Sequence, residues 1–204
     1  MPRFAAGARE QTGFSLLEVL LVVAIGLIVT AVGLPIMSTA IGNIKLRSSM
    51  TSVSGLLQNT RMVAVQQNKT KTMCHFNFSA PPYSLIFFVK DAITCSTSVT
   101  PLENDPQVEL QAPITPMATP TGTGAPSPIS NATLGLSVSP LTSDPSFNSF
   151  GLPCAYTGTA CTNSAFITYF KDNRIGGSGG WAAISVSPAG RINRWFWNGA
   201  IWTN

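Results

Sequence analysis

The chain has few side chains that could carry chemistry, and they are scattered along its length. His75 is the only histidine, and the four cysteines are Cys74, Cys95, Cys154 and Cys161. The sequence has no C-x-x-C pair, no serine or cysteine arranged with a histidine and an acid for nucleophilic catalysis, and no phosphate-binding glycine loop. We therefore expect that the protein is not an enzyme and that it uses no cofactor and no metal.

The even number of cysteines favours disulfide bonds. All four follow a long apolar segment, and a domain carried across a membrane reaches an oxidising compartment. Their order along the chain suggests the pairs Cys74–Cys95 and Cys154–Cys161, although three pairings are possible. Free buried thiols are the alternative interpretation.

One carboxylate lies inside the most apolar part of the chain. The segment TGFSLLEVLLVVAIGLIVTAVGLPIM covers residues 12–37, and Glu18 is its only charged residue. From Val19 to Ile44 no residue is charged, and a helix of that length reaches about 39 Å, whereas a bilayer core is about 30 Å thick. The sequence thus predicts a single-pass helix. Because a carboxylate in lipid costs a few kcal/mol, we expect Glu18 to have a positively charged partner.

The residues around this glutamate also carry a family resemblance. The hexapeptide GFSLLE, residues 13–18, resembles the processing site of type IV prepilins and type II secretion pseudopilins. The resemblance implies that residues 1–13 are a leader peptide, and that a prepilin peptidase cuts between Gly13 and Phe14. It also implies that Phe14 is then N-methylated and that Glu18 meets the N-terminal amine of a neighbouring subunit.

Two simpler interpretations of this region stay open. Glu18 could be an unpaired glutamate that extends to the lipid headgroups, and the apolar run could be an uncleaved signal anchor. Pro35 removes a backbone hydrogen bond and is expected to kink the helix, and members of the resembled family often carry a proline there.

The rest of the chain separates into a helical part and a strand-rich part. Apolar residues recur at a spacing of three to four up to about Gln67, which predicts one helix over residues 14–67, with a transmembrane segment at about 16–37. Beyond residue 70, β-branched and aromatic runs alternate with turn residues. Expected strands include residues 72–78, 83–91, 107–111, 165–170, 181–188 and 191–203.

These patterns predict an α+β fold. It consists of a long N-terminal helix followed by an antiparallel β-rich head over residues 70–204, as in pilins. Residues 112–146 are rich in Pro, Ser, Thr and Gly, and we expect a long surface loop or a partly disordered insertion there.

A looser resemblance points to one branch of the family. The helix end over residues 55–70, with Arg61 and Ala64, and the C-terminal hairpin around residues 187–191 resemble GspH/FimT subunits. Some FimT-like minor pilins bind DNA through a Gly-Arg-x-Arg motif in this hairpin. Here Arg191 and Arg194 are three residues apart, so a regular strand would point them to opposite faces, and DNA binding is not favoured.

We interpret the chain as a minor structural subunit of a type II secretion pseudopilus or a type IV pilus. Its expected partners are other pilin or pseudopilin subunits, the prepilin peptidase and the lipid of the bacterial inner membrane, with the head in the periplasm. A DNA-binding minor pilin that serves DNA uptake and an uncleaved single-pass periplasmic protein are the alternatives.

Overall fold

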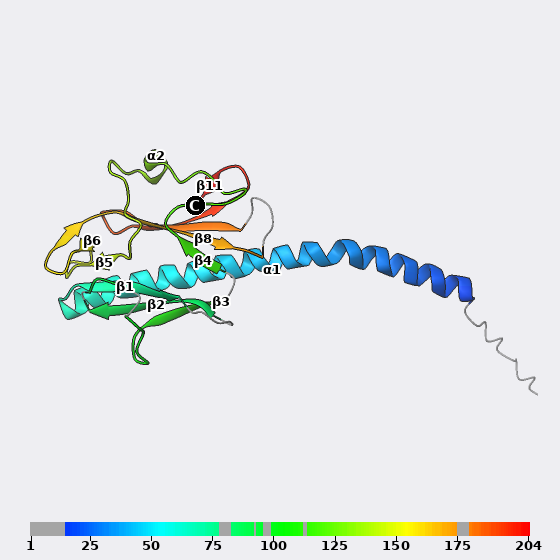
Figure 1. Ribbon diagram of the computed structural model, residues 1–204, viewed down its shortest axis with the longest axis horizontal. Coiled ribbons are helices and arrows are strands. Elements are labelled where there is room, and N and C mark those ends of the chain that lie inside the picture. Colours follow the sequence, from blue (N-terminus) through cyan, green and yellow to red (C-terminus); the bar gives the residue numbers. More distant parts are fainter. Residues whose placement is uncertain (1–14, 78–82, 92, 96–98, 112–113, 175–179) are drawn as a thin grey trace, which may run out of the picture. The chain divides into compact units, whose positions relative to one another are not determined.

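The computed structural model describes residues 15–77, 83–91, 93–95, 99–111, 114–174 and 180–204 (Figure 1). The chain divides into two compact units, Met1–Ser38 and Thr39–Asn204, and each is described by itself. Gly13 and Phe14, the predicted cleavage and methylation residues, lie outside the described residues.

Helix α1, Leu16–Gln67, is the longest element of the chain. At its start, the backbone N–H groups of Glu18 and Val19 donate to the carbonyl of Ser15. At its end, Asn68 adopts a left-handed conformation with φ of 50°. The N–H of Asn68 donates to the carbonyl of Val65, and that of Lys69 donates to the carbonyl of Ala64. This pair of bonds is a Schellman motif, in which asparagine tolerates the left-handed position better than most residues do.

The head contains two antiparallel sheets. The first has the strand order β3-β2-β1-β5-β6-β7, and the second has the order β11-β10-β9-β8-β4. In the first sheet the strands are β1 Lys71–Asn77, β2 Tyr83–Asp91, β3 Gln107–Gln111, β5 Ser146–Phe147, β6 Pro153–Tyr156 and β7 Cys161–Asn163. In the second they are β4 Ile114–Met117, β8 Phe166–Asp172, β9 Trp181–Val186, β10 Ile192–Trp197 and β11 Trp202–Thr203.

The main core of the head forms where the second half of α1 meets both sheets. Figure 1 shows this part of α1 between the β1–β3 strands and the β8–β9 strands. The buried residues Leu46, Met50, Val53 and Leu57 recur every three or four positions and pack in one cluster with side chains of both sheets. Burial of each such side chain stabilises the fold by about 1.5–3 kcal/mol. Phe87 of β2 lies 5.9 Å from Phe170 of β8, measured between ring centroids.

The structure confirms the predicted α+β class, with an N-terminal helix and an antiparallel β-rich head. Among the described residues, no helix meets the length and hydropathy that a membrane crossing requires.

Most of residues 114–146 lie outside regular secondary structure, but the segment also contains two regular elements and packs on the head. The segment contributes β4 to the second sheet and forms a short helix, α2 Asn131–Leu134. It also packs on a second cluster that contains Ile129, Tyr169 and Trp195. The N–H of Ile129 donates to the hydroxyl of Tyr169, and Trp202 Nε1 donates to the carbonyl of Ser127. Although the segment is rich in proline, it packs on aromatic side chains of the second sheet.

An arginine joins the helix to the turn before β10. Arg61 Nη1 donates to the carbonyl of Gly190 at 3.2 Å. Gly190 has φ of +81°, and a Cβ added there would lie 3.2 Å from both Cζ and Nη1 of Arg61. Glycine therefore provides both the left-handed turn and the close approach of the arginine.

We expect Gly190→Ala to destabilise the head more than Gly158→Ala. Both positions have positive φ, so both substitutions incur a backbone cost of about 1–2 kcal/mol. Only the alanine at 190 also meets Arg61, and displacing that side chain adds about 1 kcal/mol for the lost hydrogen bond. Denaturant unfolding followed by tryptophan fluorescence measures the difference. Equal losses for the two variants would contradict the close contact.

Candidate functional site

The first half of α1 exposes apolar side chains on all sides within its own unit. Leu16 is 81% exposed and Leu17 is 74% exposed. Residues 19–23 are all large aliphatic residues and are all more than half exposed. Because five consecutive residues span more than one helical turn, no side of this helix segment is covered within the unit. Such a surface is suited to contact with other apolar helices or with lipid.

Glu18 lies in the first turn of this apolar segment, and its side chain is exposed. A carboxylate near a helix N-terminus is favoured by the helix dipole. The sequence places no positively charged residue between Arg9 and Lys45, so α1 offers Glu18 no basic side chain from its own apolar part. A free amine at the helix start, or one from another chain, would supply the missing charge.

Pro35 lies within α1, which continues from Leu16 to Gln67. The helix is therefore not broken at the proline. The predicted kink stays a prediction.

One comparison with protein families concerns this N-terminal region. A prokaryotic N-terminal methylation motif matches residues 8–34, which include the predicted cleavage residues, Glu18 and most of the apolar run. This match supports a type IV pilin-like protein. Comparison with curated proteins and with solved structures found no match.

Outside the N-terminal region, both predicted disulfides of this pilin-like chain are confirmed. Cys74 of β1 pairs with Cys95, which follows β2, and Cys154 of β6 pairs with Cys161 of β7. The Cys154–Cys161 bond therefore joins two paired strands of the first sheet, and the Cys74–Cys95 bond joins β1 to the segment after β2. Cross-links of this kind stabilise mainly by restricting the unfolded chain.

The two arginines weighed for DNA contact have different surroundings. Arg194 on β10 donates from Nη1 to Thr51 of α1 at 2.7 Å. Next to it, the guanidinium of Arg47 lies 4.5 Å from the ring centre of Phe196. Arg191 is exposed and precedes β10, and its backbone N–H donates to the hydroxyl of Ser187. Arg194 therefore helps to hold α1 against β10.

A polar pocket that sequence reasoning missed lies beside β1. Its volume is about 270 Å³, and its lining includes His75, Asp144 and Cys95. His75 Nδ1 lies 2.6 Å from an Asp144 carboxylate oxygen. This hydrogen bond raises the pKa of His75 above its ordinary value, and partial burial opposes the shift. The two residues are 69 positions apart, so no local pattern could have paired them.

Asp172 and Arg174 form an ion pair in the second sheet's β8 region. Asp172 is fully buried, and Arg174 binds it through Nε and Nη2. This bond raises the pKa of the Arg174 guanidinium. The pair joins a buried carboxylate to an exposed guanidinium at the end of β8.

We expect the stability of the head to fall as pH rises from about 6 to about 8, because of His75. Its folded pKa lies above the unfolded value of about 6.5. The stabilisation is therefore complete below the unfolded pKa and is lost as pH rises through the raised folded pKa. Unfolding midpoints measured across this range test the effect.

Asp144→Asn is the matched control, because it keeps the shape of the side chain and removes its charge. The variant should lose most of the pH dependence, since His75 is the only histidine. A midpoint in the parent protein that does not change over this range would contradict the pairing.

Proposed function

We propose that the protein is a minor subunit of a type IV pilus or of a type II secretion pseudopilus. The observation that carries the proposal is the methylation motif at residues 8–34 on a helix that exposes apolar side chains on all sides. An N-terminus of this kind is processed and then packed against the same segment of other subunits. The GspH/FimT resemblance of the helix end and the C-terminal hairpin supports a minor role within the filament.

Before assembly, the apolar run holds the chain in the inner membrane with the head in the periplasm. This part of the proposal rests on the charge-free sequence between Val19 and Ile44. The two disulfides of the head agree with an oxidising compartment. The protein acts through subunit contacts and not through catalysis.

Glu18 provides the register of assembly. Cleavage after Gly13 creates a positive amine at Phe14, four residues before Glu18. In a packed filament the amine of one subunit meets the carboxylate of another, and each charge then offsets the desolvation of the other. Because an unpaired buried charge is costly, subunits packed out of register would be disfavoured.

We expect co-expression with a prepilin peptidase to shorten the chain to residues 14–204, with a methyl group on Phe14. Intact-mass measurement and N-terminal sequencing identify the product. Gly13→Ala is the matched control and should leave the chain starting at Met1, because the family peptidase cuts after glycine. An uncut parent chain, in cells where a known prepilin is cut, would overturn the proposal in favour of an uncleaved anchor.

We expect Glu18→Gln to be processed normally and to fail in assembly. The substitution keeps the size of the side chain and removes the charge that the amine requires. Co-purification with the other filament subunits after crosslinking measures assembly, with at least about a tenfold loss expected for one buried ion pair left incomplete. A Glu18→Gln chain that assembles as well as the parent would show that the carboxylate is not the docking group.

A further inference from the structure

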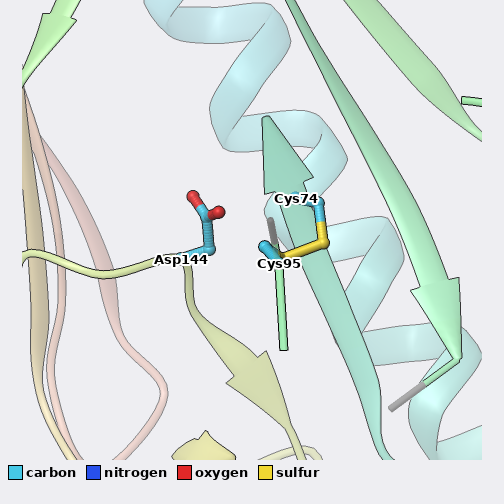
Figure 2. A group of neighbouring side chains, drawn as sticks. All are labelled: Cys74, Cys95 and Asp144. Carbon is cyan, nitrogen blue, oxygen red and sulfur yellow. A yellow bond between two sulfur atoms is a disulfide. The ribbon is translucent and has the colours of Figure 1, made fainter. Parts of the chain in front are cut away.

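Three potential metal ligands from distant parts of the sequence meet beside β1 of the first sheet. The sulfur atoms of Cys74 and Cys95 and a carboxylate oxygen of Asp144 all lie within 4.8 Å of one another. Figure 2 shows the Asp144 carboxylate on one side of the Cys74–Cys95 bond, with Cys74 on β1. The two sulfurs form a disulfide in this structure, so the group is a cross-link in its oxidised form.

The two residues that follow Asp144 are both hydrogen-bonded to β1. The N–H of Met73 donates to the carbonyl of Pro145 at 3.0 Å. The hydroxyls of Thr72 and Ser146 lie 2.7 Å apart in a buried hydrogen bond. These bonds fix the segment that carries Asp144 against β1, whether or not the cysteines are bonded to each other.

His75 fixes the carboxylate itself. Successive residues on a strand point to opposite faces, so Cys74 and His75 approach Asp144 from different sides. His75 Nδ1 binds one carboxylate oxygen at 2.6 Å, which leaves the other oxygen for a second contact. This is the arrangement of a ligand and its positioning residue in protein metal sites.

We propose that reduction of the Cys74–Cys95 disulfide converts this group into a zinc site with the ligands Cys74, Cys95 and Asp144. Two thiolates and one carboxylate match the ligand preference of Zn²⁺, whereas Mg²⁺ and Ca²⁺ prefer oxygen ligands alone. Ligand atoms around a tetrahedral zinc ion lie about 3.3–3.8 Å apart, given bonds of about 2.0–2.3 Å. The present separations, within 4.8 Å, are already close to that requirement once the sulfur–sulfur bond is broken.

The neighbouring pocket supplies access and a fourth ligand. Cys95 and Asp144 both line the cavity of about 270 Å³, and water there can complete a tetrahedral set.

The conversion consists of two balanced steps. A dithiol reductant gives two electrons and two protons to the disulfide, becomes a disulfide itself and leaves two thiols on the protein. Zn²⁺ then binds the two thiolates, and their two protons pass to solvent. The same cysteines thus join β1 to the segment after β2 in either state, through the disulfide bond or through a shared zinc ion.

The experiment uses the full chain, reduced with a dithiol and then freed of it without air, and titrated with Co²⁺ as a spectroscopic substitute for Zn²⁺. We expect one ion per chain, with thiolate-to-cobalt charge transfer and the intense visible bands of tetrahedral cobalt. Added Zn²⁺ should displace the cobalt and abolish both signals. The oxidised chain should give neither signal.

Three variants separate this site from other causes. Cys74→Ser with Cys95→Ser keeps Cys154 and Cys161 and should lose the signal, so the same signal in that variant would overturn the assignment. Asp144→Asn should weaken binding by at least about tenfold, and His75→Gln should weaken it less. An unchanged affinity in Asp144→Asn, or no cobalt bands in the reduced parent chain, would overturn the proposed ligand set. Circular dichroism of each reduced variant checks that the head is folded.

Discussion

The head depends on the burial of one face of the second half of α1 between two β-sheets. Leu46, Met50, Val53 and Leu57 share a single apolar cluster with Phe87 from one sheet and Phe170 from the other. A sheet can bury an apolar face only against another element, and a helix with one apolar stripe likewise requires a partner surface. The helix is therefore the core element that both sheets share. The disulfides and the arginine contacts stabilise the arrangement that this burial produces.

The sequence predicted those parts of the fold in which local pattern and burial agree. Strands β2 and β3 were predicted with their observed bounds, because aromatic and β-branched residues fill them between clear turn residues. Strands β5, β6 and β7 were missed, since segments of two to four residues are too short to show a period. Their pairing depends on β1 and on one another, which is information that only the folded chain contains.

The functional features divide in the same way. The methylation motif is a short stretch of consecutive residues, and so the hexapeptide at residues 13–18 could be recognised directly from the sequence. The grouping of His75, Asp144 and the Cys74–Cys95 pair could not, because the tertiary fold brings these residues together across sequence separations of 21 and 69. Arg194 shows a third case. It was weighed as a DNA contact, whereas in the fold its exposed side chain donates to a hydroxyl on α1.

The contacts between α1 and the C-terminal hairpin can form only after the hairpin has been synthesised. Arg61 binds Gly190 across 129 positions, and Arg194 binds Thr51 across 143. Synthesis of the chain delivers α1 first and the hairpin last. Strands β8 and β9 can cover the apolar stripe of the helix before then, because they contribute buried side chains to the same cluster. A chain truncated before β10 would still lack the Arg194–Thr51 bond and the two last strands of the second sheet.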